Sequence, residues 1–232
     1  MESFSLEGWY VLLRWFHVLA GIAWIGMLYY FNLVQTPFFK AADPAVRSGM
    51  VRGVVPIALW WFRWGAMFTF ITGLLILLTK IGHEHVGLGT SYMTRILTGG
   101  LLGTTMWANV WFVIWPAQQV VIANATKVAA GGEADPAAPA RGARAGLASR
   151  TNTLFSIPMV FFMVSAQSFP SLATNTNVAL YWILALVVVL AIEVNALVGT
   201  GQARQKPLAT VSGTIHAGIA LTFILFALMV VI

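Results

Sequence analysis

Six long apolar stretches, separated by short polar segments, dominate the pattern of hydrophobic and polar positions along the chain. A membrane-spanning helix needs about 20 apolar residues at a rise of 1.5 Å each. The stretches predict spans over residues 9–36, 54–79, 92–115, 152–172, 178–199 and 208–232. Ala, Gly, Pro and Arg dominate residues 131–149, which favours a mobile loop there. The pattern therefore predicts an all-α, polytopic helical bundle that forms a single membrane domain over residues 1–232.

Composition supports a membrane protein. The 232 residues are 59% hydrophobic and only 9% charged, whereas a soluble domain has about 25% charged residues. The first apolar run is too long for a cleaved signal peptide and has no positive charge before it, so we expect it to stay in the mature protein.

The basic residues lie mainly in alternate loops, on one predicted side of the bundle. The loops after the first, third and fifth spans contain nine: Lys40, Arg47, Arg52, Lys127, Arg141, Arg144, Arg150, Arg204 and Lys206. The opposite side has two, Lys80 and Arg95. The positive-inside tendency then predicts both termini outside a bacterial-type inner membrane. The net charge of +6 is a topology signal of this kind and does not indicate nucleic-acid binding.

The chain has no cysteine. This excludes disulfides, iron–sulfur clusters and thiolate ligands, and also a c-type haem, whose covalent attachment needs a Cys-x-x-Cys-His motif.

His17 is an ionisable residue inside the first apolar run, where such groups are costly and often functional. Helical spacing places Arg14, Gly21 and Trp24 on its face, with Ala20 also there. Small residues leave room for a flat macrocycle, and Arg14 could pair with its propionates. We therefore predict a haem b with His17 as axial ligand. In the alternative interpretation the small residues pack another helix, Arg14 snorkels and His17 donates to a carbonyl.

Two further groups of ionisable residues are candidates. In the inner half, Glu193 and His216 could form a proton relay or a structural hydrogen-bonded pair. In the loop after the second span, His83 and His85 could help to bind a metal from outside. The second haem ligand stays open among His216, one of the loop histidines, a methionine or none, since His216 and His17 differ by about 10 Å in predicted depth.

Three sequence blocks resemble the N-terminal membrane domain of the PuuD-type urate oxidases (urate hydroxylases). They are Leu13-Arg14-Trp15-Phe16-His17-Val18-Leu19-Ala20-Gly21-Ile22-Ala23-Trp24-Ile25-Gly26; Leu59-Trp60-Trp61-Phe62-Arg63-Trp64 with Thr72-Gly73; and Ser149-Arg150-Thr151-Asn152-Thr153-Leu154-Phe155-Ser156-Ile157-Pro158 running on to Phe169-Pro170. The resemblance implies a membrane redox domain that, in the family, is joined to a C-terminal cytochrome c domain. This sequence ends at Ile232 without one, so we expect any cytochrome c to be a separate partner.

The sequence departs from the family pattern at two places. Where the family has Asn-His-Tyr-Pro, this chain has Gln167-Ser168-Phe169-Pro170, and where the family has Arg-His-Phe-Phe-Asn, it has Glu193-Val194-Asn195-Ala196. Two family histidines are thus replaced, so the resemblance supports the fold more directly than urate chemistry.

The sequence favours an integral membrane electron-transfer protein with haem b, surrounded by membrane lipids and working with a cytochrome c or a larger complex. Two alternatives stay open. One is a cofactor-free structural subunit of a respiratory or photosynthetic membrane complex, and the other is a small-solute or proton transporter that uses Glu193.

Overall fold

The computed structural model describes residues 6–168, 177–199 and 201–232, which are helical and contain no strand. In chain order the elements are α1 (Leu6–Tyr29), the π-helical turn η2 (Tyr30–Gln35), α2 (Thr36–Ala41), α3 (Pro44–Gly82), α4 (Ser91–Ala108), the π-helical turn η3 (Asn109–Ile114), α5 (Trp115–Ala129), α6 (Ala138–Ser168), α7 (Val178–Leu197), the 3-10 helix η4 (Ala203–Ala209) and α8 (Val211–Val231).

Six helical stretches of the described chain are long and apolar enough to cross a membrane. They are Glu7–Ala41, Pro44–Gly82, Ser91–Ala129, Ala138–Gln167, Val178–Leu197 and Val211–Val231. The predicted all-α architecture with about six membrane helices is therefore confirmed. The last part of the predicted fourth span, residues 169–172, lies outside the described residues.

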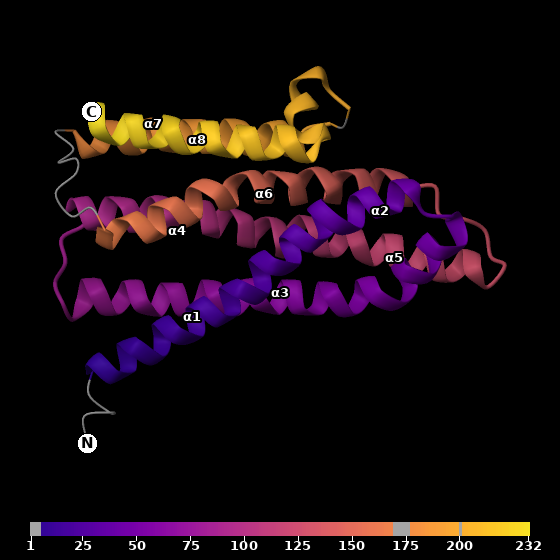
Figure 1. Ribbon diagram of the computed structural model, residues 1–232, viewed down its shortest axis with the longest axis horizontal. Helices are drawn as coiled ribbons and strands as arrows, with labels where there is room; N and C mark the ends of the chain where they lie inside the picture. The colour runs from indigo at the N-terminus through magenta and orange to yellow at the C-terminus, as the bar shows by residue number, and fades with distance from the viewer. Residues whose placement is uncertain (1–5, 169–176, 200) are drawn as a thin grey trace.

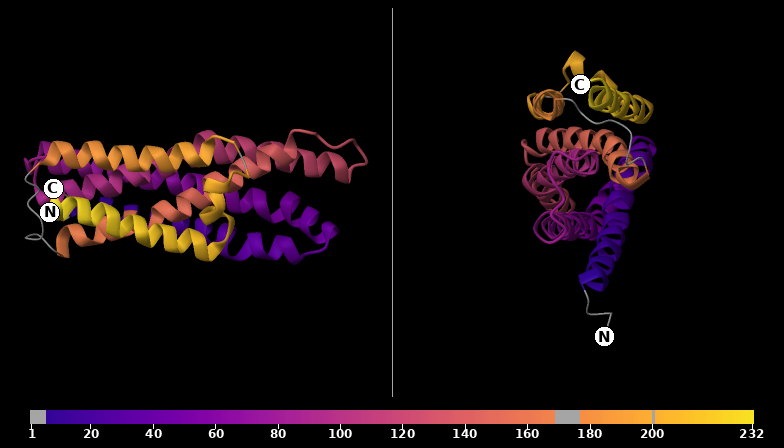
Figure 2. Two further views of the ribbon diagram at one scale, coloured as in Figure 1. Left: turned by 90° about the horizontal axis from the view of Figure 1, so that it is seen from above. Right: turned by 90° about the vertical axis from the view of Figure 1, so that its left-hand side faces the viewer.

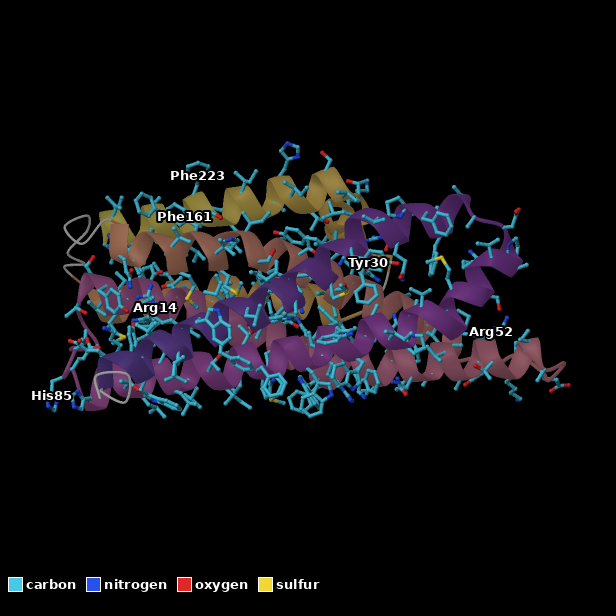
Figure 3. All side chains as sticks on the ribbon, turned by 60° about the horizontal axis from the view of Figure 1, so that its bottom comes forward. Arg14, Tyr30, Arg52, His85, Phe161 and Phe223 are labelled. Carbon is cyan, nitrogen blue, oxygen red and sulfur yellow. The ribbon has the colours of Figure 1, made fainter. Side chains whose placement is uncertain are left out.

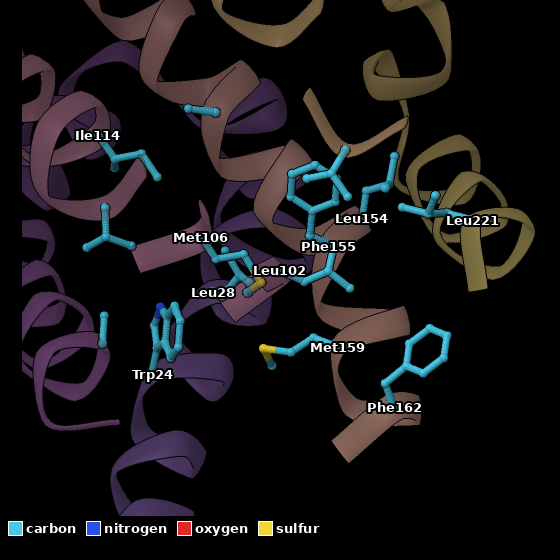
Figure 4. Packing of buried hydrophobic residues seen from close by; sticks show 14 of the residues in the cluster. Trp24, Leu28, Leu102, Met106, Ile114, Leu154, Phe155, Met159, Phe162 and Leu221 are labelled. Carbon is cyan, nitrogen blue, oxygen red and sulfur yellow. The ribbon is translucent and has the colours of Figure 1, made fainter. Parts of the chain in front are cut away.

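Most helices lie along one long axis, which α1 crosses obliquely, and α7 and α8 form an outer layer against α6 (Figure 1; Figure 2). The α6 helix is central. In its apolar stretch of 18 residues 61% is buried inside the structure, against 33% or less in the corresponding stretches of the other spans. The core runs from Trp24 and Leu28 on α1 through Phe155 on α6 to Leu221 on α8 (Figure 4). A hydrogen bond from Asn177 N to Ile232 O, 3.0 Å long, joins the start of α7 to the end of α8.

The helices differ greatly in length, and this creates a head at one end of the bundle. The α7 helix has 20 residues and α3 has 39, which correspond to about 30 Å and 58 Å of helix, and a bilayer core is about 30 Å thick. The helices α7 and α8 flank only part of the long axis (Figure 1). Beyond them extend η2, α2, the start of α3, α5, the start of α6 and η4, which we call the head.

A belt of tryptophans lies between the head and the rest of the bundle; its members are Trp60, Trp61, Trp64, Trp111 and Trp115. Trp60 and Trp61 are 48% and 55% exposed, as expected for rings at a membrane–water interface. From Arg63, within the belt, α3 continues to Gly82, which is about 29 Å of helix and matches the hydrocarbon thickness. The exposed rings of the belt and this helix length are those expected where a membrane face meets the bundle. Figure 3 shows Arg52 of the head and His85 at opposite ends of the molecule.

The predicted loop over residues 131–149 is wrong for its second half, because α6 begins at Ala138. Alanine has the highest helix propensity, and this segment is rich in it. Ala138, Ala145 and Ala148 are buried, so the segment packs as an ordered helix. Only residues 131–137 connect α5 to α6, and there Asp135 N donates to Asn124 Oδ1 at 2.7 Å.

The helices of two predicted spans extend further at the head than the spans themselves. The helix of the second span begins at Pro44, ten residues before the predicted span, and that of the third continues through η3 and α5 to Ala129. Pro116 lies just after the predicted end of the third span, and a proline inside a helix removes an N–H and crowds the preceding turn. The wide turn η3 directly before α5 accommodates it, so the helix continues into the head.

Candidate functional site

His17 lies on α1 and faces α3, where its ring is partly buried. Its Nδ1 is 3.1 Å from Thr72 Oγ1. The Thr72 hydroxyl donates its single proton to the carbonyl of Phe68 at 2.6 Å, so it accepts from the imidazole. Nδ1 of His17 therefore carries the proton, and Nε2 keeps the lone pair with which a histidine binds a metal.

Gly73 makes room for this ring. A Cβ at residue 73 would lie 3.0 Å from His17 Cε1, tighter than ordinary van der Waals contact. The pair Thr72-Gly73 thus fixes the orientation of His17 through a hydrogen bond and a close approach. Thr72 was not predicted as a site residue, and the only signal in the sequence was its place in the second family block.

The other residues predicted around His17, namely Arg14, Gly21 and Trp24, also lie on α1, and each has different neighbours. Arg14 is exposed, and its Nη2 donates to Gln167 Oε1 on α6 at 3.4 Å. Gly21 faces Thr69 of α3, since a Cβ at residue 21 would lie 3.9 Å from the Thr69 side chain. Trp24 is 2% exposed, and its buried indole N–H has no hydrogen-bond partner within the part of the chain that the structure describes. The contact between Arg14 and Gln167 confirms that the start of α1 and the end of α6 lie at one level.

The loop histidines His83 and His85 are exposed in the connection between α3 and α4. No group of three or more His, Asp or Glu side chains that could hold a metal occurs in residues 6–168, 177–199 and 201–232. The structure therefore brings no further ligands to this pair.

His216 is exposed on α8, and its Nδ1 interacts with Ser212 of the same helix, with the carbonyl at 2.8 Å and with Oγ at 3.2 Å. The Glu193 carboxylate accepts a hydrogen bond from Asn109 of η3, so the described residues do not show the predicted pairing of Glu193 with His216. The α8 helix, which carries His216, lies in the outer layer, away from the contact between α1 and α3 (Figure 2).

Glu193 belongs to a buried polar network with Asn109 and Asn152. Asn109 Nδ2 donates to Asn152 Oδ1 at 2.9 Å and to Glu193 Oε2 at 3.0 Å. Asn152 Nδ2 donates to the carbonyl of Met106 at 2.9 Å. Asn109 is the first residue of η3, and π-helical turns of this kind often occur at functional sites. The network links α4, α6 and α7 near the belt.

A second polar contact zone joins α6 to the other π-helical turn. Asn32, in η2, is buried, and its Nδ2 donates to Ser149 Oγ at 2.8 Å and to the Leu28 carbonyl at 2.9 Å. Tyr29 and Ser156 share a hydrogen bond of 3.0 Å between their hydroxyls. These contacts explain why the third family block is rich in Ser, Thr and Asn, because its side chains connect α6 to its neighbours.

Fold and site together define a polytopic α-helical membrane protein with an oriented histidine in its first span and a buried Asn–Asn–Glu network. The chain belongs to the family described as urate oxidase N-terminal, whose model matches residues 87–229. The matched range includes the Asn109–Asn152–Glu193 network and does not include His17. Searches of the curated proteins and of the solved structures gave no match.

Proposed function

We propose that this membrane-domain protein transfers electrons in a bacterial-type inner membrane and holds a b-type haem through His17. The observation that carries the proposal is the hydrogen bond from His17 Nδ1 to Thr72, which leaves Nε2 free as a ligand. A histidine that binds a metal usually donates its other ring N–H to a neighbour in this way. When bound, the haem would supply one-electron transfer.

The residues around His17 suit such a group. Arg14 is exposed, and its contact with Gln167 is long at 3.4 Å, so its guanidinium is available to the carboxylates of a haem.

The proposal includes the partners expected from the sequence. Both termini would lie on the outer side of the membrane, where a separate cytochrome c or a larger membrane complex would exchange electrons with the haem. The basic residues of the head favour this orientation, because they would then lie on the inner side.

The experiment is a reduced-minus-oxidised spectrum and a pyridine-haemochrome assay on the purified protein and on His17→Ala. We expect haem b in the wild type and its loss in the variant. His216→Ala is the matched control, because His216 is exposed on α8 and should not change the spectrum. A colourless wild type would contradict the proposal and support a cofactor-free subunit, and an unchanged His17→Ala spectrum would remove His17 as ligand.

Thr72 would position the His17 ring for the haem through its hydrogen bond to Nδ1. Thr72→Val keeps the shape and removes the acceptor for His17 Nδ1, so haem affinity should fall by about 10- to 100-fold. Thr72→Ser keeps the hydroxyl and should retain the haem. Haem titration of the two apoproteins measures the difference, and equal affinities would contradict the assigned hydrogen bond.

A further inference from the structure

A cavity of about 870 Å³ lies in the head, between η2, α2, the start of α3, α5, the start of α6 and η4. The cavity reaches the tryptophan belt, because its wall includes Leu59, Phe62 and Ile114, which are sequence neighbours of belt tryptophans. It is separate from His17, since Phe31 on its wall is 14 residues further along the chain, or about 21 Å of helix. The cavity therefore joins the head to the level of the belt without reaching the histidine.

The charges on the cavity wall have one sign. Arg47, Arg150 and Lys206 line it, and no Asp or Glu is among the described lining residues. These three cations form no ion pair with any part of the chain that the structure describes. A concave site lined by one sign of charge concentrates ions of the opposite sign, so the cavity favours a negatively charged group.

Two of the cations lie near the belt. Arg150 Nη1 donates at 2.8 Å to the carbonyl of Leu208 in η4, the turn that carries Lys206. Two residues along α6 from Arg150, Asn152 accepts a hydrogen bond from η3, the turn that carries Trp111 of the belt. Aromatic belts lie at the level of the lipid headgroups. Arg150 and Lys206 therefore present positive charge at the depth where lipid phosphates are found.

An unsatisfied acceptor, Gln35 Oε1, lies further into the head. Asn32 of η2 donates to Ser149, the residue before Arg150, at 2.8 Å, so Asn32 is level with Arg150. Gln35 follows three residues later, at the end of η2 next to α2. Its Oε1 is buried and has no hydrogen-bond partner among the described residues, which costs free energy unless a donor reaches it. A ligand that suits this position carries an O–H or N–H donor.

These features follow the order of the chemical groups in a phospholipid. The cavity has apolar side chains at the belt, the Arg150–Lys206 pair beside them, and the Gln35 acceptor beyond. A phospholipid has its acyl chains in the bilayer, its phosphate at the interface and its headgroup beyond. Basic pockets between membrane helices bind anionic lipid headgroups.

We propose that this cavity binds an anionic phospholipid whose headgroup carries a hydroxyl group beyond the phosphate. Arg150 and Lys206 bind the phosphate, and the headgroup hydroxyl donates to Gln35 Oε1. The acyl chains extend past the belt into the bilayer. The proposal does not depend on a haem at His17.

The test compares three lipids with identical acyl chains on the delipidated full chain in dodecyl maltoside. Phosphatidylglycerol and phosphatidylethanol both have a net negative charge, but only phosphatidylglycerol has hydroxyls beyond its phosphate, and phosphatidylcholine has no net charge. Native mass spectrometry measures the dissociation constant of each lipid. We expect phosphatidylglycerol to bind most tightly, phosphatidylethanol about fivefold more weakly, and phosphatidylcholine more weakly still. Equal binding of phosphatidylglycerol and either other lipid would overturn the proposal.

Three variants locate the site. Lys206→Gln should weaken phosphatidylglycerol and phosphatidylethanol alike, by about two- to fivefold, the effect of one partly exposed ion pair. Gln35→Leu should weaken phosphatidylglycerol by about fivefold and leave phosphatidylethanol unchanged, because it removes only the acceptor for the hydroxyl. Arg52→Gln is the control, because Arg52 is on the same helix as Arg47 but outside the cavity wall. An Arg52→Gln effect as large as that of Lys206→Gln, or a Gln35→Leu effect of equal size on both lipids, would overturn the site.

A final arm distinguishes a bilayer lipid from a dissolved phosphate ester. Glycerol phosphate has the phosphate and the hydroxyls but no acyl chain. At millimolar concentration it should leave phosphatidylglycerol binding unchanged, because buried acyl chains supply much of the affinity of a lipid. Displacement of phosphatidylglycerol by the soluble ester would assign the cavity to a ligand from water and contradict the proposal.

Discussion

Replacing Asn109 by alanine should destabilise the bundle, because Asn109 bridges two other residues of its buried polar network. The side chain donates two hydrogen bonds from Nδ2, at 2.9 Å to Asn152 and at 3.0 Å to Glu193. Because all three residues are buried, water cannot easily replace the lost donor. Asn109→Ala therefore leaves two acceptors on two other helices without their partner.

The size of the effect follows from these two bonds. Hydrogen bonds between membrane helices contribute about 0.6 kcal/mol each on average and at most about 1.7 kcal/mol, so two give about 1.2 kcal/mol. A buried acceptor left unsatisfied adds a penalty of about 1–3 kcal/mol in the least favourable case. We expect Asn109→Ala to lower the free energy of unfolding by about 1–3 kcal/mol.

The assay is reversible unfolding of the purified protein by SDS in mixed micelles, followed by tryptophan fluorescence. Glu193→Gln keeps an oxygen acceptor of the same shape, so its cost should be below about 0.5 kcal/mol. Asn195→Ala is the matched control on α7, because the buried Asn195 Oδ1 has no hydrogen-bond partner among the described residues. The reasoning is refuted if Asn109→Ala costs no more than Asn195→Ala, or if Asn109→Ala and Glu193→Ala are simply additive.

Two further changes test the packing. Gly65→Ala should lower the free energy of unfolding by about 1–3 kcal/mol by overpacking, because its Cβ would lie 2.9 Å from the backbone N of Trp24. Gly100→Ala is the control: a Cβ there would have no atom within 4 Å, so the change should be neutral or stabilising in the same unfolding assay. Equal effects of the two changes would contradict the close approach of α1 to α3. Arg63 lies 3.8 Å from the ring centre of Trp115, so Arg63→Leu should cost about 0.5–2 kcal/mol by loss of cation–π contact, and an unchanged unfolding midpoint would show that this contact contributes nothing.

The number of spans was predictable because an uncharged apolar run of about 20 residues is rarely anything but a membrane-spanning helix. The head was not predictable in the same way, since hydropathy detects where a helix is apolar and not where it ends. The helices of the second and third spans continue past their apolar runs into the head, and Ala138–Ser149 forms a helix from a composition typical of a loop. The third helix passes Pro116 because the wide turn η3 directly before it accommodates the proline.

Of the candidate site, the sequence predicted some ionisable residues but not the side chains that contact them. His17 and Glu193 were found because an ionisable group inside an apolar run is costly and needs a partner. Thr72, the hydrogen-bond partner of His17, was not predicted, because a sequence position gives depth along a helix but not the direction of a side chain around it. For His216 the surrounding helix is apolar on all sides, so periodicity gave no indication that it faces outward.

The cavity of the head could not be predicted from the sequence. Its wall is assembled from elements that are far apart in the sequence, and none of its cations or amides stands out in its own segment. Only the structure places Gln35 and Arg47 beside Arg150 and Lys206.

The most direct test of haem binding by His17 is chemical rescue. His17→Gly removes the imidazole next to Gly73 and leaves space beside Thr72. If His17 Nε2 is the axial ligand, the variant purifies without haem, and reconstitution with haem and free imidazole restores the wild-type reduced-minus-oxidised spectrum. A His17→Gly protein that retains the wild-type spectrum without imidazole would contradict the assignment.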